Sequence, residues 1–453
     1  MSAVTSAPAE RTLFGHPAGL AYLGFTEAFE RFSYYGMQGL LVLYMTGHLL
    51  HPAHAEAVLG LGKLRGAVEA FTGPLSTQAF ASQIFGLYAG CVFVTPMLGG
   101  WIGDRFTGRT AAVTVGTALM AAGHLLMAIE TSFLIALVLL IAGSGLLKGN
   151  ISAQVGAMYA ERDPRRGDAF SIFNMFIQTG AFVGPLVCGA LGEMAGWHYG
   201  FGAAGIIVLF AFGIYLTGRR HLPPDPPRRA RNIRAIARLD AREWRIVAAL
   251  LLVLVIQLPP AILDNQDFNI LAIWAQDHVE RHVLGFEIPV SWLFSLNALA
   301  FVALTPVVVA WWRWQERRRR EPSEMGKMAI SGVLYVVSAL IIAWAPAGTG
   351  KTHIAWAAAH MILGAVGIVF VWPLVLALIS RAAPARIQSL MMGVAFFSVA
   401  IAAFLAGWLG QFYERMGHAN FWAMHAGFAL ASAVLFACLA RPLNRFFAAT
   451  APA

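Results

Sequence analysis

The chain has 453 residues, of which 58% are hydrophobic and only 12% are charged, about half the charged share of an ordinary soluble domain. A soluble protein of this length is excluded, and isolated cysteines within apolar runs exclude a disulfide scaffold. The net charge of +9 does not indicate nucleic-acid binding, because few basic residues lie outside the flanks of hydrophobic segments. Composition therefore predicts an all-α polytopic membrane protein.

Twelve apolar segments are long enough to cross a bilayer as helices. We place them at 18–47, 77–103, 110–129, 132–160, 168–194, 199–218, 246–275, 288–312, 325–346, 353–380, 387–413 and 420–440. Residues 1–17 lack a basic stretch followed by an apolar core, so we expect no cleavable signal peptide.

The basic residues predict the orientation, because cytoplasmic loops carry an excess of lysine and arginine. With both termini inside, 25 of the 32 Lys and Arg residues lie in cytoplasmic segments. We therefore expect a multi-pass protein of the bacterial inner membrane with cytoplasmic termini.

A basic link at 218–245 separates six spans from six, which predicts bundles at 1–217 and 246–453. Around Ala230–Arg245 the link is amphipathic, so it could form a helix that binds lipid or a partner. We favour the simpler interpretation, a solvated linker whose arginines set the topology. Two six-span halves match the major facilitator superfamily, whose substrates bind between the halves near mid-membrane.

Span one carries an unusual concentration of charge. Glu27, Glu30 and Arg31 are offset by three and four positions and so share one helix face, which Tyr34 continues. Charges within a bilayer are costly and usually functional. The cluster could merely hold helices together, but we favour a cavity-lining site, in which a carboxylate pair can hold a proton.

Two further spans carry ionisable groups. Lys148 in span four is either a proton-exchanging amine or a structural partner of Glu27 or Glu30. In span seven, Asp264 and Asp267 follow Pro259-Pro260 in a polar belt, as in a broken helix that lines water. Asp267 could equally lie at the periplasmic mouth of that helix.

The run Glu27-x-x-Glu30-Arg31-Phe32-x-Tyr34-Tyr35-Gly36 resembles the ExxERFxYYG signature of the proton-dependent oligopeptide transporter family, within the major facilitator superfamily. The runs at 99–109, 148–173 and 383–407 are similar to other parts of that family. The resemblance covers both halves and implies the major facilitator fold of 12 helices.

The resemblance also implies roles for individual residues. Substrate binding would involve Arg31, Tyr34, Tyr35, Lys148, Gln178 and Asn297. Proton coupling would involve Glu27, Glu30, Arg31, Lys148 and Asp264. A conformational latch between spans two and three would comprise Gly100, Asp104, Arg105, Gly108 and Arg109. The function implied is symport of protons with di-/tripeptides or peptide-like compounds by alternating access.

The chain departs from the family pattern at several places. Ile368 stands where the family has a span-ten glutamate that receives the peptide amino group, and Gln38, Ala395 and Phe93 replace an arginine, a tryptophan and a tyrosine. We therefore expect an atypical substrate that does not require a free amine, with transport or export of a non-peptide organic anion as the alternative.

Other features carry little chemistry. His48, His51 and His54, and likewise His278 and His282, have spacings that could serve a metal, but no ligand set is complete, so we expect no metal. His124, His360 and His425 are interpreted as satisfied core residues. We find no nucleophile–base pair or phosphate-binding loop, so we expect no enzyme and no cofactor, the proton gradient being the energy source. We also expect a monomer with no nucleic-acid partner.

Overall fold

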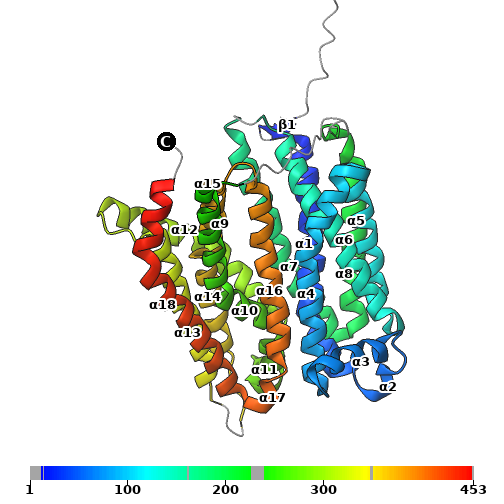
Figure 1. The fold of residues 1–453 in the computed structure, drawn as a ribbon. Coiled ribbons are helices and arrows are strands. Elements are labelled where there is room, and N and C mark those ends of the chain that lie inside the picture. The colour runs from blue at the N-terminus through cyan, green and yellow to red at the C-terminus, as the bar shows by residue number, and fades with distance from the viewer. Residues whose placement is uncertain (1–11, 14, 161–162, 226–238, 347–349, 451–453) are drawn as a thin grey trace, which may run out of the picture. The chain divides into compact units, whose positions relative to one another are not determined.

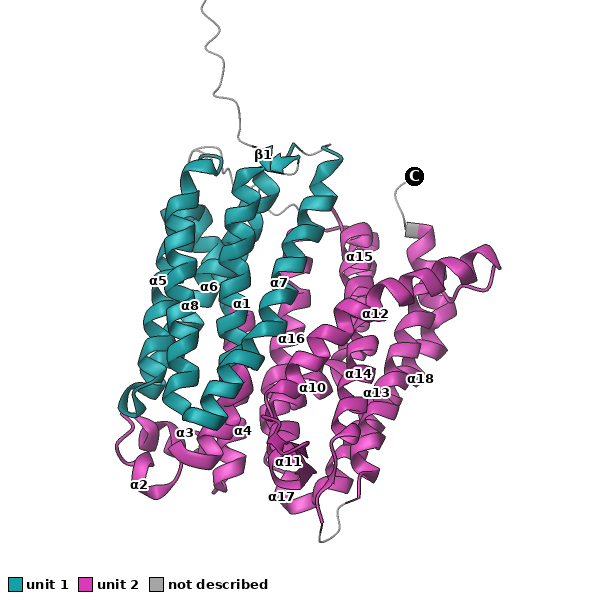
Figure 2. Cartoon of the chain, turned by 180° about the vertical axis from the view of Figure 1, so that it is seen from behind, with its two compact units in different colours: residues 1–37, 95–231 teal, residues 38–94, 232–453 magenta. Residues whose placement is uncertain are grey.

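The computed structural model describes residues 12–13, 15–160, 163–225, 239–346 and 350–450. Figure 1 shows a succession of long helices joined by short connections, which confirms the all-α prediction. The chain divides into two compact units, residues 1–37 with 95–231 and residues 38–94 with 232–453 (Figure 2). Most of the predicted linker, residues 226–238, lies outside the described residues.

The described part of the first unit contains the beginning of α1, the end of α4 and four complete long helices. Its elements are β1 (Thr12–Leu13), β2 (His16–Pro17), α1 (Ala18–Tyr44) up to Met37, α4 (Thr77–Ile102) from Thr95, η2 (Gly103–Thr107), α5 (Arg109–Met127), η3 (Glu130–Ser132), α6 (Phe133–Ala157), α7 (Arg165–Ala190), η4 (Leu191–Ala195), α8 (Trp197–Gly218) and η5 (Arg219–His221). β1 and β2 form a short antiparallel pair, with Leu13 opposite His16.

The second unit contains the remaining parts of α1 and α4 and all of the C-terminal helices. Its further elements are η1 (Met45–Leu49), α2 (Pro52–Ala55), α3 (Leu61–Thr72), α9 (Ala241–Ile256), α10 (Leu258–Gln266), η7 (Asp267–Leu271), α11 (Ala272–His278), α12 (Trp292–Arg317), α13 (Glu324–Trp344), α14 (Ala355–Val369), α15 (Trp372–Ala382), α16 (Gln388–Gly410), α17 (Tyr413–Met416) and α18 (His418–Thr450). Two-residue strands pair β3 (Val279–Glu280) with β6 (Thr352–His353) in parallel and β4 (His282–Val283) with β5 (Phe286–Glu287) antiparallel.

The predicted spans agree with the helices. Among the described residues, eleven helical segments are long and apolar enough to cross a membrane. α1, which carries the charged cluster, is not among them, but its 27 residues give a length of about 40 Å at 1.5 Å per residue. With α1 counted, twelve segments correspond to the twelve predicted ones.

Glycines let α7 approach α1 closely in the first unit. A Cβ atom at Gly180 would collide with the carbonyl oxygen of Ala28, and one at Gly184 would collide with that of Phe32. Small residues spaced by four allow this kind of helix packing in membranes. The contact fixes α1 along the side that carries Ala28, Arg31 and Phe32.

Span seven is interrupted where the sequence has two prolines. α9 ends at Ile256 and α10 begins at Leu258, with the prolines in its first turn, because proline cannot donate the hydrogen bond that a continuous helix needs. Gln257, between the two helices, donates a hydrogen bond of 3.0 Å to Ser398 of α16. The prediction of a proline-broken helix is confirmed.

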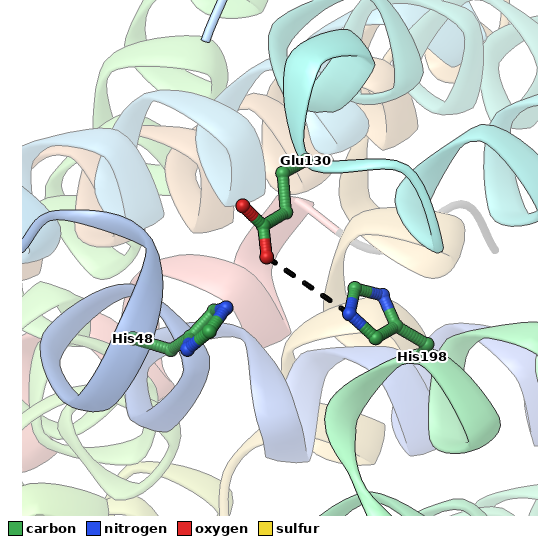
Figure 3. Close-up of side chains that lie close together, drawn as sticks. All are labelled: His48, Glu130 and His198. Carbon is green, nitrogen blue, oxygen red and sulfur yellow. Dashed lines mark ion pairs between the residues drawn. The ribbon is translucent and has the colours of Figure 1, made fainter. Parts of the chain in front are cut away.

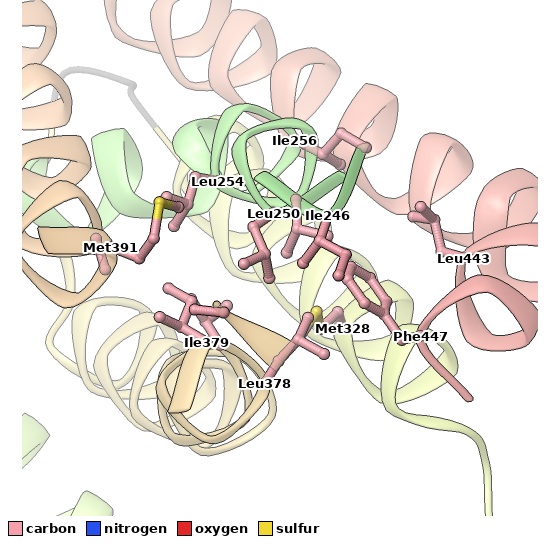
Figure 4. Close-up of a cluster of buried hydrophobic side chains, with 14 of the residues drawn as sticks. Ile246, Leu250, Leu254, Ile256, Met328, Leu378, Ile379, Met391, Leu443 and Phe447 are labelled. Atoms are coloured by element: carbon pink, nitrogen blue, oxygen red, sulfur yellow. The ribbon is translucent and has the colours of Figure 1, made fainter. Parts of the chain in front are cut away.

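A hydrophobic cluster surrounds α9 in the second unit. Ile246, Leu250 and Leu254 recur every four residues on one face of α9, the spacing of a buried helical stripe. Figure 4 shows them among Met328 of α13, residues of α15 and α16, and Phe447 of α18. This cluster anchors the first half of the broken span.

The short helices α2 and α3 precede span two and were not predicted. Arg65 of α3 donates hydrogen bonds to Glu69 at 2.9 Å and to the carbonyl oxygen of Leu75 at 2.7 Å. Glu69 in turn accepts a bond from the Leu75 backbone N–H. These contacts close the connection from α3 to α4.

Candidate functional site

The span-one charges form one buried cluster on α1. The Nε atom of Arg31 lies 3.1 Å from Glu27 Oε1 and 2.5 Å from Glu30 Oε2. All three side chains are at least nine-tenths buried. Two carboxylates thus compete for one guanidinium in a setting where an unpaired charge would be expensive.

The carboxylates are not saturated by hydrogen bonds. Among the described residues, neither oxygen of the Glu30 carboxylate has a hydrogen-bond partner, and the same holds for Glu27 Oε2. The contacts of Arg31 Nε with the two carboxylates are therefore ion pairs.

Tyr34 joins Lys148 of α6 to this cluster. The Nζ atom of Lys148 lies 4.5 Å from the centroid of the Tyr34 ring, and Arg31 Cζ lies 5.4 Å from the same centroid. Both separations are those of cation–π contacts. Tyr35 packs edge-on against Tyr34, with ring centroids 5.1 Å apart. The structure therefore brings together six of the predicted residues, from Glu27 to Lys148.

Three other predicted residues lie elsewhere. Gln178 lies on α7 in the first unit, two residues before the close contact at Gly180. Asn297 and Asp264 belong to the second unit. Asn297 of α12 donates a hydrogen bond of 3.3 Å to the carbonyl oxygen of Met361 in α14, and Asp264 lies on α10. Their substrate and proton roles remain predictions.

The predicted latch occupies the turn between α4 and α5. Arg109 Nε lies 3.5 Å from Asp104 Oδ1, and Gly108 has a φ of +85°, a conformation that favours glycine. Gly100 lies at the end of α4, and Arg105 is exposed within η2. The Arg109–Asp104 contact and the backbone conformation of Gly108 shape this turn. Its role as a conformational latch stays a prediction.

Sequence reasoning missed the residue that caps α5. Asp225, which follows α8, accepts a hydrogen bond of 3.1 Å from the Thr110 backbone N–H. A carboxylate at the beginning of a helix satisfies a free N–H group and complements the helix dipole. Its distance from Thr110 along the chain explains why no local pattern revealed it.

In the second unit, Asp267 forms a buried pair with a histidine. Asp267 Oδ1 lies 2.9 Å from His360 Nε2, and His360 Nδ1 lies 2.8 Å from Ser338 Oγ and 2.9 Å from the Ser338 carbonyl oxygen. Asp267 is 5% and His360 2% exposed. Asp267 is therefore buried and paired, and its placement at the periplasmic mouth of the helix stays a prediction.

The other buried histidines differ from one another. His425 contacts Gln266 and the carbonyl oxygen of Phe421, so its interpretation as a satisfied core residue is confirmed, as it is for His360. His124 is buried, but neither ring nitrogen has a hydrogen-bond partner among the described residues. The prediction was wrong for His124, because no described polar group of the neighbouring helices reaches its ring.

The histidines with metal-like spacing have different neighbours. The rings of His48 and His54 lie 4.1 Å apart, whereas His282 contacts Glu280 at 3.0 Å and His278 lies beside His418. Figure 3 shows a different pair, His198 Nε2 at 3.9 Å from Glu130 Oε1, which joins α8 to the turn η3. His48, also labelled there, belongs to the second unit.

The positions that depart from the family pattern lie in several environments. Ile368 is partly buried near the end of α14, just before the break that precedes α15. Gln38 is buried, and Phe93 is partly buried. Ala395 is fully buried within the hydrophobic cluster around α9. Ala395 therefore packs among apolar side chains of the second unit.

Comparisons with known proteins agree with this arrangement. Residues 23–407 match the family model described as Major Facilitator Superfamily. The chain is 29% identical to the uncharacterised transporter YclF of Bacillus subtilis (strain 168), with 92% of each chain covered. It is 28% identical to the peptide transporter YePEPT of Yersinia enterocolitica subsp. palearctica serotype O:3 (strain YE-P4), with 90% of each covered.

The solved structures give the same result. A crystal structure of a mutant of the peptide transporter POT in complex with alafosfalin has a TM-score of 0.84 and 27% identity, and covers 96% of this chain and 97% of that one. A POT family transporter in complex with 5-aminolevulinic acid has a TM-score of 0.82 at 21% identity, which supports the fold alone.

Within the described residues, twelve hydrophobic helical segments with a charged cluster buried on the first define a polytopic membrane transporter. The chain belongs to the Major Facilitator Superfamily. Within that superfamily, the resemblance of the span-one motif to the proton-dependent oligopeptide transporters is confirmed.

Proposed function

We propose that this chain is a proton-coupled symporter of di-/tripeptides or peptide-like compounds. The observation that carries the proposal is the placement of Arg31 between Glu27 and Glu30, beside Lys148 and Tyr34. Arginine offers a fork that matches a carboxylate, and in this state two carboxylates of the protein already claim it.

This competition links proton binding to substrate binding. A proton on Glu27 or Glu30 would neutralise a carboxylate that competes with the substrate for Arg31. A guanidinium N–H would then be free to bind the substrate carboxylate. Conversely, a bound substrate carboxylate would favour the protonated form of the glutamate, because linkage between two ligands is reciprocal. Lys148 would supply a second positive charge. Symport needs this coupling between proton and substrate.

The relatives support peptides as the substrate class. Proteins from Yersinia enterocolitica and Lactococcus lactis that resemble this chain at 28% and 27% identity are named peptide and di-/tripeptide transporters. The similar crystal structure holds alafosfalin, and another of the same transporter holds sulfate. We propose the same class here, with both termini cytoplasmic in a bacterial inner membrane, a monomeric state and no cofactor.

We further propose that the substrate does not need a free amino group. Ile368 cannot accept a hydrogen bond from an ammonium group. Asp267, a possible substitute, is already paired with His360. An ammonium without an acceptor would lose binding energy on entering the site. Asp264, which is half-buried, is the carboxylate of span seven that remains to be tested.

Uptake into proteoliposomes under an imposed inward proton gradient tests both the proposed symport and the proposed tolerance of a blocked amino group. Labelled dialanine is offered in competition with N-acetyl-dialanine, trialanine and a simple organic anion such as succinate. We expect gradient-dependent uptake and competition by N-acetyl-dialanine at least as strong as by dialanine. A clear preference for free amines would contradict the proposed specificity. Competition by succinate alone, or outward transport, would favour the alternative of an organic anion transporter or exporter.

A further inference from the structure

We propose that His360, with Asp267 and Ser338, forms a second proton-binding site in the second unit. His360 lies in span ten, Asp267 in span seven and Ser338 in span nine. The role of this site in transport rests on the proposed proton coupling. The geometry of the site rests only on the contacts of these three side chains.

The first argument is that both ring nitrogens of His360 face good partners. Nε2 faces the Asp267 carboxylate at 2.9 Å. Nδ1 faces both the carbonyl oxygen of Ser338 at 2.9 Å and its hydroxyl at 2.8 Å. A carbonyl only accepts a hydrogen bond, whereas a hydroxyl can donate or accept one.

These partners satisfy the ring in two protonation states. In the charged state, Nε2–H donates to Asp267, Nδ1–H donates to the Ser338 carbonyl, and the Ser338 hydroxyl donates to the His360 carbonyl oxygen, 3.0 Å away. In the neutral state, Nε2–H still donates to Asp267, and the Ser338 hydroxyl rotates to donate to Nδ1. One proton can therefore enter or leave without breaking the contact between His360 and Asp267.

The second argument is the electrostatic surroundings. Asp264 lies one helical turn before Asp267 and interacts electrostatically with both Asp267 and His360. Tyr335 of α13 interacts with the two carboxylates. From α18, the uncharged ring of Trp422 packs edge-on against His360, with centroids 5.4 Å apart. Two carboxylates thus face one histidine.

The third argument is the place of the site in the fold. His360 precedes the break between α14 and α15, and Asp267 follows the break between α9 and α10. The proton determines whether these two interrupted spans are joined by an ion pair or by a hydrogen bond from the neutral ring to the Asp267 carboxylate. Interrupted helices of this kind form the substrate and coupling-ion sites of secondary transporters, so a proton at His360 would change the contact between two such helices.

The test follows the protonation of His360 directly. Full-length protein labelled with ¹⁵N-histidine is studied in lipid nanodiscs by solid-state NMR between pH 5 and 9, and the His360 signal is the one missing in His360→Gln. We expect the ring to pass from doubly protonated to singly protonated at Nε2 within this range. A ring that keeps one protonation state throughout would overturn the proposal.

Two substitutions should move the titration in opposite directions. Asp267→Asn removes the carboxylate that favours the charged ring, so the midpoint should fall by about one pH unit or more. Ser338→Ala removes the hydroxyl donor of the neutral state, so the midpoint should rise. The control is His425→Gln, at a buried histidine that contacts Gln266 and a carbonyl oxygen, which should leave the midpoint unchanged. Unchanged midpoints in both Asp267→Asn and Ser338→Ala would defeat the proposal.

Transport by the same samples separates this inference from the proposed function. Gradient-driven peptide uptake with a non-titrating His360 would refute the second proton site alone. A titrating His360 without gradient-driven uptake would support the site and refute the proposed symport. If both hold, His360→Gln should reduce gradient-driven accumulation several-fold more than it reduces exchange of peptide at equal pH.

Discussion

The ammonium group of Lys148 lies over the face of the Tyr34 ring, 4.5 Å from its centroid. The tyrosine belongs to α1 and the lysine to α6, so the contact joins spans one and four within the first unit. Since Arg31 approaches the same ring, one aromatic side chain holds two cations close together. Such a pair of positive charges would suit the carboxylate of the proposed substrate, and Glu27 and Glu30 lie beside Arg31 to balance it.

We expect Tyr34→Leu to impair transport more than Tyr34→Phe. Phenylalanine keeps the aromatic face, whereas leucine removes an interaction of about 0.5–2 kcal/mol with each cation. Loss of one such contact corresponds to a several-fold rise in the KM for dialanine uptake. Uptake kinetics of both variants in proteoliposomes provide the measurement. Equal KM values for the two variants would show that the ring face does not position Lys148.

The close contact between α1 and α7 predicts that Gly180→Ala lowers stability. The added methyl group would meet the Ala28 carbonyl oxygen, and overpacking of this kind typically costs about 1–3 kcal/mol. The control is Gly202→Ala on α8, where nothing lies within 4 Å of an added Cβ, so helix propensity should make it neutral or stabilising. Thermal unfolding in detergent compares the two. A Tm for Gly180→Ala at or above that of Gly202→Ala would contradict the packing described here.

A second glycine contact predicts a conformational effect. In the second unit, a Cβ atom at Gly86 of α4 would lie 2.7 Å from the Cα atom of Gly407 in α16. Gly86→Ala should therefore push these helices apart and favour conformations in which they are separated. Spin labels at Thr77 and Glu414, both exposed in this unit, report the separation by pulsed EPR. We expect longer distances in Gly86→Ala, and unchanged distances in the control Gly66→Ala, whose Cβ would meet nothing within 4 Å.

The connection between α3 and α4 should loosen in acid. The hydrogen bond from Arg65, followed by that from the Leu75 backbone N–H, lowers the pKa of Glu69 below the usual value of about 4.3 for glutamate. A lowered pKa in the folded state means that the stabilisation is complete above the usual value and is lost as the pH falls through the lowered one. A spin label at exposed Ala67 should become more mobile over that acidic range, and Glu69→Gln should abolish this dependence.

The sequence predicts the spans well for a physical reason. A helix in lipid must be both long and apolar, so each span leaves a run of about 20 residues that needs no partner to be seen. α2 and α3 leave no such signal, since α3 has 12 residues, of which Leu61 alone is buried. Its tie to α4 depends on Arg65, which looks like an ordinary exposed charge in the sequence.

In the candidate site, too, contacts within one helix could be predicted from the sequence, whereas contacts between distant residues could not. The charges of α1 are three and four residues apart, so their common face follows from helix geometry, and the family motif placed Lys148 beside them. The partnership of Asp267 and His360 spans 93 positions and matches no motif, so only the folded chain reveals it. His124 was misjudged for the complementary reason, because sequence does not show whether a buried ring meets a partner.

The central claim is that protons act on substrate binding through Glu27, Glu30 and Arg31. The most direct measurement compares gradient-driven uptake with exchange of labelled for unlabelled dialanine at equal pH. It uses wild-type protein, Glu27→Gln and Glu30→Gln, with Glu69→Gln as the control at a partly exposed ion pair outside the predicted spans. We predict that both span-one variants lose gradient-driven accumulation by at least tenfold and keep exchange, since exchange needs no release of a proton, while Glu69→Gln keeps both. Wild-type accumulation in Glu27→Gln and Glu30→Gln would contradict the account.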